Sequence, residues 1–113
     1  MKFIFEVRIK PGYSAEEYAD KWVRASELIQ EKAGARGTRL HRKIGDPHVL
    51  LAIASWESRA TREAEDDRER AARIKRILEE DADKCEITVI GEFEEPEWVV
   101  LPPDNGMDPA EIY

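Results

Sequence analysis

The chain of 113 residues has a single cysteine, Cys85, and no long apolar run. One cysteine excludes an internal disulfide and a thiolate metal cluster within one chain, and it is typical of a reducing compartment. We therefore expect a cytoplasmic protein. No segment approaches the roughly 20 apolar residues that span a bilayer. The N-terminal sequence MKFIFEVRIK also lacks the pattern of a signal peptide, so we expect no membrane association.

Positive charge is also scarce. The 18 Lys and Arg residues are outnumbered by 25 Asp and Glu residues, which gives a net charge of −7. The basic residues are scattered along the chain, whereas nucleic acids and anionic membranes attract concentrated Lys and Arg. We therefore expect neither as a partner. The sequence also lacks a phosphate-binding loop, a nucleophile elbow and a dinucleotide fingerprint.

The apolar pattern predicts one domain with six elements. Residues 2–10 alternate apolar and polar side chains, which is typical of a half-buried strand. Ser14 and Glu17 form a capping box that predicts a helix over about 14–33, with Tyr18 and Trp22 on its inward stripe. The remaining predicted elements are strands over about 36–44, 48–56 and 85–93 and a second helix over about 58–81.

The two central strands are predicted to form a hairpin with Gly45 and Asp46 as its two-residue loop. This register fixes which side chains share a face. The face expected to meet the helices has Thr38, Leu40, Arg42, Ile44, Val49, Leu51, Ile53 and Ser55. The opposite face has Arg39, His41, His48, Leu50, Ala52, Ala54 and Trp56.

The order βαββαβ predicts an α+β, ferredoxin-like fold with a four-stranded antiparallel sheet. Right-handed crossovers place both helices on one face of that sheet. The other face stays apolar and uncovered, so we expect a homodimer with its sheets face to face. We assign residues 1–95 to this domain and 96–113 to a Pro-rich tail. The apolar residues 98–101 are expected to cross to the partner; folding over the chain's own pocket and staying mobile remain open.

Several segments resemble the antibiotic biosynthesis monooxygenase family, within the dimeric α/β barrel superfamily. They are Pro11-Gly12 after the first strand, Trp22, Gly34-Ala35-Arg36-Gly37, Trp56-Glu57-Ser58 and the following helix rich in Ala and Arg. The resemblance covers about residues 1–93. It implies a dimeric barrel with a pocket between sheet and helices in each protomer, and chemistry without a cofactor. The haem-degrading branch of the family uses a His and a Trp in the second helix; residues 58–82 contain neither.

The candidate site residues fall into two groups. Tyr18 and Trp22 either pack the core or line an aromatic-ligand pocket. Arg42 pairs with Asp67 as a structural ion pair, or it stabilises an anion in the pocket. His41 and His48 lack a third ligand, so we expect no metal site. The pocket candidates are Phe5, Tyr18, Trp22, Arg42 and Asp67, and the dimer-interface candidates are Arg39, His41, Trp56 and Trp98.

The resemblance implies a cofactor-independent monooxygenase-like protein that acts on a small aromatic or polyketide-like substrate. In such chemistry the substrate anion reduces oxygen, and the protein supplies a dry pocket. Two alternatives remain on the same scaffold. One is a non-catalytic dimer that binds a small ligand or responds to stress, and the other is an isomerase or decarboxylase.

Overall fold

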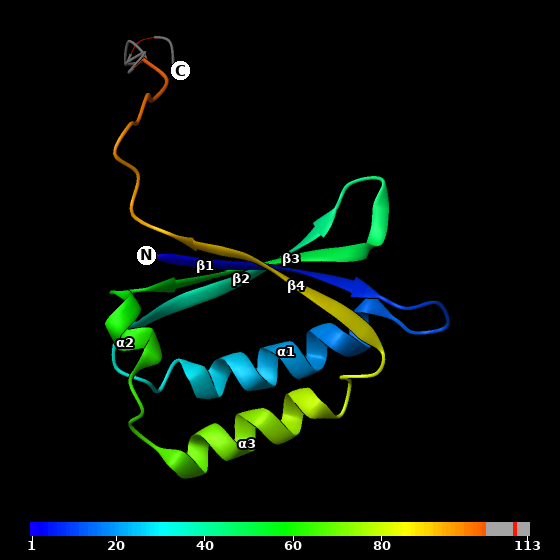
Figure 1. Cartoon of the computed structure of the whole chain (residues 1–113). Coiled ribbons are helices and arrows are strands. Elements are labelled where there is room, and N and C mark those ends of the chain that lie inside the picture. The colour runs from blue at the N-terminus through cyan, green and yellow to red at the C-terminus, as the bar shows by residue number, and fades with distance from the viewer. Residues whose placement is uncertain (104–109, 111–113) are drawn as a thin grey trace.

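The computed structural model describes residues 1–103 and 110, which fold into one antiparallel sheet with helices on one of its faces (Figure 1). The elements are β1 (Lys2–Ile9), α1 (Ala15–Ile29), β2 (Ala35–Lys43), β3 (Asp46–Trp56), α2 (Arg59–Glu63), α3 (Arg68–Glu79) and β4 (Cys85–Phe93). The strand order is β2-β3-β1-β4. The predicted ferredoxin-like α+β fold is therefore confirmed. None of the described helices is both long and apolar enough to cross a membrane.

The core lies where α1 packs on the central strands. Val7 of β1 is fully buried and Leu50 of β3 is 3% exposed, and the two are paired across the sheet. Tyr18 of α1 belongs to the same apolar cluster. The helix starts as its capping signal predicts, because the Glu17 backbone N–H donates to Ser14 Oγ at 3.1 Å.

The predicted register of β2 against β3 is wrong by one residue. Lys43 pairs with Asp46, so the turn consists of Ile44 and Gly45, with Gly45 at a φ of 87°. The ladder is irregular between Arg42 and Lys43, so Arg42 opposes Leu50 and not Val49 as the predicted loop requires. This one-residue shift exchanges the two faces of β3. Ile44, expected beneath the helices, is 99% exposed at this turn. The β3 side chains on the helix face are therefore Leu50, Ala52, Ala54 and Trp56, and those on the open face are Val49, Leu51, Ile53 and Ser55.

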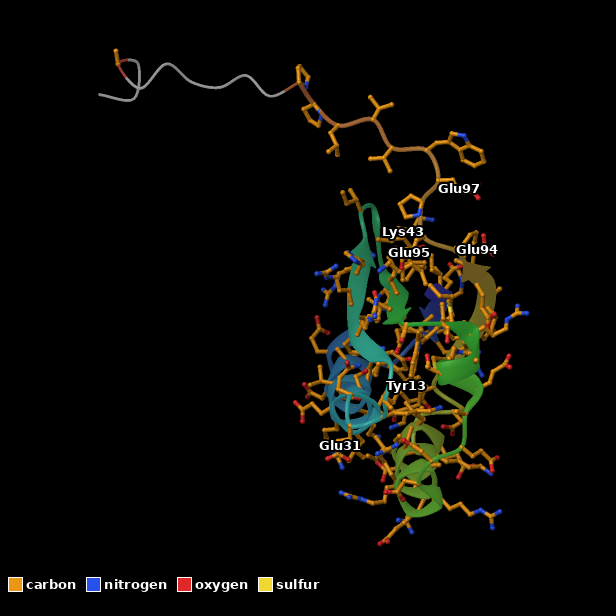
Figure 2. The ribbon with its side chains drawn as sticks, turned by 90° about the vertical axis from the view of Figure 1, so that its left-hand side faces the viewer. Tyr13, Glu31, Lys43, Glu94, Glu95 and Glu97 are labelled. Carbon is orange, nitrogen blue, oxygen red and sulfur yellow. The ribbon has the colours of Figure 1, made fainter. Side chains whose placement is uncertain are left out.

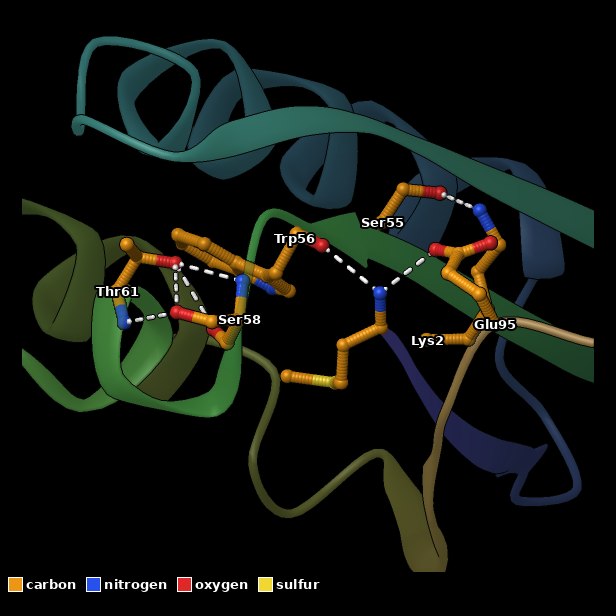
Figure 3. Close-up of polar contacts among 7 residues, drawn as sticks. Lys2, Ser55, Trp56, Ser58, Thr61 and Glu95 are labelled. Atoms are coloured by element: carbon orange, nitrogen blue, oxygen red, sulfur yellow. Dashed lines mark hydrogen bonds and ion pairs between the residues drawn. The ribbon is translucent and has the colours of Figure 1, made fainter.

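The second predicted helix is interrupted. The Ser58 side chain caps α2 and accepts from the Thr61 backbone N–H (Figure 3). The chain then leaves the helical conformation at Ala64, whose φ and ψ are −63° and 133°. Asp67, expected on an inward helical stripe, instead caps α3 by accepting from the Arg70 backbone N–H at 2.9 Å. One continuous helix over 58–81 is therefore a wrong prediction.

Helix α3 packs along α1 (Figure 1). None of its residues is buried, and Leu78 is 40% exposed. On the opposing edge strand, Ile87 and Val89 are 56% and 60% exposed. Both pair with helix-facing residues of β1. The space between α3 and the β4 side of the sheet is therefore not filled by side chains of the described residues.

The C-terminal end of α3 is tied to α1 by a buried carboxylate. Asp81 is 4% exposed and accepts from Lys21 Nζ at 2.6 Å, while Lys84 Nζ lies at 3.1 Å. Burial alone would raise the pKa of Asp81, but the two ammonium groups outweigh it and hold that pKa below its ordinary value. This cluster fixes one end of α3 while its middle stands away from the sheet.

After β4 the chain leaves the sheet and points away from the helices, as the positions of Glu94, Glu95 and Glu97 indicate (Figure 2). The Met1 ammonium group donates to Glu95 Oε1 at 2.7 Å and to the Trp56 carbonyl at 2.9 Å (Figure 3). Beyond this anchor Trp98 is 87% exposed. The rest of the expected tail, residues 104–109 and 111–113, lies outside the described residues.

Candidate functional site

A cavity of about 700 Å³ lies between the helix-facing side of the sheet and helices α1 and α3. This volume is within the roughly 300–1,000 Å³ of typical small-molecule pockets. The wall is predominantly apolar and aromatic. Its side chains include Phe3, Phe5, Ala52, Ala54 and Trp56 from the sheet, Tyr18, Trp22, Ala25 and Ile29 from α1, and Ala71, Ile74 and Leu78 from α3.

The cavity results from small residues placed opposite large ones. Ala52 and Ala54 lie beside Phe5 and Phe3 on the paired strands, so the sheet presents rings next to shallow gaps. Ala71 presents only a methyl group from α3. Because α3 packs on α1, these gaps stay open. A flat apolar ligand between aromatic side chains matches this shape.

Two titratable groups of the wall are held in their neutral forms. Burial raises the pKa of the Tyr18 phenol well above its usual range, with Cys85 and Asp81 nearby adding to the effect. Burial likewise raises the pKa of the Cys85 thiol, which donates to the Asp81 carbonyl at 3.5 Å. At neutral pH Tyr18 is therefore a hydrogen-bond donor, and neither group acts as a base.

Two cations lie on the wall, Arg62 of α2 and Lys75 of α3, and Arg62 is the less exposed, at 30% against 76% for Lys75. The Arg62 guanidinium stacks over the Phe3 ring, 3.7 Å from the centroid. Its Nη1 donates to Glu92 Oε1 at 2.8 Å, and Arg59 Nε donates to the other oxygen of the same carboxylate. These contacts hold the planar group in a fixed orientation at the edge of the cavity.

A second recess of about 630 Å³ adjoins the cavity and shares Trp56 and Arg62 with it. It lies between the end of α1 and the 64–67 segment that separates α2 from α3. Several of its charged groups have partners. Arg70 bonds to Asp66, and Lys32 Nζ lies 5.3 Å from the centroid of the Trp56 ring. This recess is therefore a polar entrance beside the apolar cavity.

The structure brings three of the five pocket candidates together. Phe5, Tyr18 and Trp22 all lie on the cavity wall. Arg42 lies outside the cavity, where its Nη2 donates to Glu16 Oε1 at 2.7 Å. That guanidinium holds the pKa of Glu16 below its ordinary value. The predicted pairing of Arg42 with Asp67 is therefore wrong, and Asp67 lines the polar recess.

The four interface candidates occupy different places. Arg39 and His41 pair with Ile53 and Leu51, so they lie on the open face of the sheet. Trp56, expected on that face, is 7% exposed on the helix side and lines the cavity. Trp98 lies in the exposed segment after β4. The error for Trp56 follows directly from the one-residue register shift.

Sequence reasoning missed Arg62, because the segment around it has the composition of a solvated helical face. Its importance depends on contacts with Phe3 and Glu92, which come from opposite ends of the chain. The local sequence has no signal for such contacts. Among the described residues, no group of three or more His, Cys, Asp or Glu side chains could hold a metal ion.

The fold and the cavity define a ferredoxin-like α+β domain with an apolar pocket beneath its helices. A sequence model of the antibiotic biosynthesis monooxygenase family matches residues 1–80. The chain belongs to this family. Among curated proteins, none matches the chain.

Solved structures with the same fold are distant in sequence. An antibiotic biosynthesis monooxygenase is 18% identical, with a TM-score of 0.61 over 84% of this chain and 98% of its own. SnoaB, a cofactor-independent oxygenase from Streptomyces nogalater, is 13% identical, with a TM-score of 0.60 over 86% and 96%. A conserved protein from Methanosarcina mazei Go1 is 16% identical, with a TM-score of 0.59 over 81% and 91%. At these identities the likeness establishes the fold alone.

Proposed function

We propose that this protein is a cofactor-independent monooxygenase-like enzyme that oxidises a small aromatic or polyketide-like substrate inside the cavity. The observation that supports this most is the apolar, aromatic-walled space of about 700 Å³ beneath the helices of a chain in this family. The shared fold of SnoaB, a cofactor-independent oxygenase, agrees with the proposal. Function still depends on the site rather than on the fold.

The reaction needs a substrate that can itself reduce oxygen. An acidic CH₂ group between aromatic rings loses a proton, and the resulting carbanion bonds to O₂ and takes up a proton to give a hydroperoxide. Loss of water then leaves a carbonyl, so that CH₂ and O₂ become C=O and H₂O. The protein's part is to orient the ring system and to exclude water from the carbanion.

The wall residues have separate roles in this proposal. Phe5, Trp22 and Trp56 contact the faces and edges of a ring system, and their rigid side chains lose little entropy on binding. The Tyr18 phenol donates a hydrogen bond to a substrate oxygen, because its raised pKa keeps it protonated. These contacts fix the position of the reacting carbon.

We also propose that the protein is a homodimer formed through the open face of its sheet. Leu51 and Ile53 of β3 and Ile4 of β1 lie there without a covering layer in the described chain. Exposed Ile90 on β4 extends this apolar surface. Sedimentation should give a dimer at micromolar concentration, and a stable monomer would contradict the proposal.

Oxygen uptake by metal-free protein, with a panel of hydroquinones and anthrones, tests the enzymatic proposal. We expect uptake above the buffer rate, and we expect Trp22→Ala to lower it by about ten- to a hundredfold because the substrate loses its alignment. Trp98→Ala is the matched control, since Trp98 lies outside the cavity. Uptake equal to the buffer rate with every compound would refute the proposal.

A second candidate is a non-catalytic binding protein for a small aromatic ligand. The protonated states of Tyr18 and Cys85 favour it, because they leave the wall without a buried base in the described residues. A ligand that raises the melting temperature but consumes no oxygen would support this second candidate over the first.

A further inference from the structure

We propose that Arg62 is the anion anchor of the cavity, and that the substrate binds as a preformed aromatic oxyanion, a phenolate or an enolate. The charged oxygen would sit on the Arg62 guanidinium, and the ring system would fill the apolar chamber. This inference rests on the proposed function, because it takes the cavity as the substrate site. It assigns to Arg62 the role that sequence reasoning gave to Arg42.

The Arg62 guanidinium has N–H donors that Glu92 does not use. A guanidinium has five N–H donors, of which Glu92 takes one. Within the described part of the chain, no further hydrogen bond from this guanidinium is found. Guanidinium donors at an apolar wall, with the side chain only 30% exposed, favour an oxyanion more than they would in open solvent.

The charges around Arg62 leave a net positive group at the wall. Arg59 and Arg62 both bond to the single carboxylate of Glu92, whose side chain is only 16% exposed. Glu63 lies 4.0 Å from Arg59, and Lys32 Nζ bonds to the Arg62 carbonyl, so the cluster has three cations and two carboxylates and keeps a net positive charge. Stacking on Phe3 and a bond from Lys32 Nζ to the Arg62 carbonyl at 2.5 Å hold the residue in place. An anionic ligand completes the neutralisation of this cluster.

The described part of the wall has no buried base, so the substrate must be ionised before or upon binding. Tyr18 and Cys85 stay protonated, and neither can remove a proton. The wall carboxylate, Glu79, is 60% exposed and lies 3.7 Å from Lys75 Nζ. A cation beside an acidic phenol or enol lowers its pKa, so Arg62 can favour the anion without a protein base.

The prediction concerns the pKa of a bound probe. We would use 4-nitrophenol, whose ionised form absorbs visible light, and titrate it free and bound to the protein. Burial in an apolar chamber alone raises a phenol's pKa, whereas a cation within about 4–6 Å lowers it by about 1–3 units. We expect the bound probe's pKa to fall below its free value in the wild type and to rise above that value in Arg62→Gln.

Arg59→Gln is the matched control. It also removes one positive charge and one bond to Glu92, but Arg59 is 68% exposed and is not on the cavity wall. We expect it to preserve the lowered pKa. Arg62→Lys should restore part of the effect, since it keeps the charge without the planar fork. Circular dichroism checks that Arg62→Gln folds. If it does not, the role of Arg62 is tested by the pKa of the probe bound to Arg62→Lys and by the affinity of the wild type for the neutral ether 4-nitroanisole. The wild type should then bind the phenolate at least about tenfold tighter than the ether.

Three results would overturn the inference. The first is the same pKa for the probe bound to the wild type and to Arg62→Gln. The second is a loss of the pKa shift in Arg59→Gln as large as that in Arg62→Gln. The third is that neither 4-nitrophenol nor 4-nitroanisole binds. These measurements need no turnover, so the two proposals fail separately. A lowered probe pKa without oxygen uptake would refute the enzymatic proposal alone. Oxygen uptake without a shift in the pKa would refute the role of Arg62 alone.

Discussion

Replacing Ala71 with leucine tests whether the space beneath α3 is empty. Ala71 lines the cavity from a helix that has no buried residue. Leucine adds three carbon atoms to the side chain, and full burial of each one stabilises the folded state by about 0.8 kcal/mol. If half of that surface is covered by Trp22 and the sheet, the gain in the free energy of unfolding is about 1 kcal/mol. In a filled core the same change would instead cost about 1–3 kcal/mol through overpacking.

The sign of the effect is therefore diagnostic, and thermal unfolding followed by circular dichroism measures it. A gain of about 1 kcal/mol should raise the melting temperature by about 4 °C in a domain of this size. Ala25→Leu is the matched control, because Ala25 is on the same cavity wall but only 1% exposed. It should lower the melting temperature. Equal destabilisation by both variants would mean that α3 packs closely on the sheet, which would refute the open cavity.

Three further predictions concern stability and assembly. The pKa of Asp81 in the folded protein lies below its ordinary value of 3.8. The stabilisation that ionised Asp81 gives the fold is therefore complete above pH 3.8, and it is lost as the pH falls through the lower pKa of the folded protein. Asp81→Asn should therefore flatten the acid limb of a stability-against-pH curve; an unchanged limb would refute the role of Asp81. Gly34→Ala should cost more stability in denaturant titrations than Gly45→Ala. Both glycines have positive φ, a conformation that costs an alanine about 1–2 kcal/mol. At Gly34, however, the added Cβ would also lie 2.5 Å from Thr61 Cβ. Equal losses would contradict that clash. Truncation after Glu95 keeps the bond to Met1 and should weaken dimerisation at least about tenfold in sedimentation; an unchanged dimer constant would contradict a crossing tail.

Local sequence signals were sufficient for most of the fold. The alternation along β1 and the capping box at Ser14 act over a few residues, and the structure has both a strand and a capped helix there. The break between α2 and α3 also had a local signal that was overlooked. Asp is a preferred N-cap residue, and Asp67 immediately precedes α3.

The hairpin register could not be decided locally, because Gly45 belongs to the turn in either register. Both two-residue loops, Ile44-Gly45 and Gly45-Asp46, would leave the same side chains on each face; the faces of β3 change because the ladder is irregular between Arg42 and Lys43. The cost of the wrong register was large, since it placed Trp56 on the open face and left it out of the pocket candidates. Arg62 was beyond sequence reasoning for a different reason. Its role depends on tertiary contacts with Phe3 and Glu92.

The central claim is that the cavity oxidises an aromatic substrate with oxygen and no cofactor. The isotope content of the product formed from anthrone under ¹⁸O₂, with metal-free protein, tests it most directly. The proposal predicts anthraquinone with a single ¹⁸O atom, with the second atom released as water, and a much slower reaction in Trp22→Ala, which alters the cavity wall. No conversion above the buffer rate, or a product without the label, would contradict it.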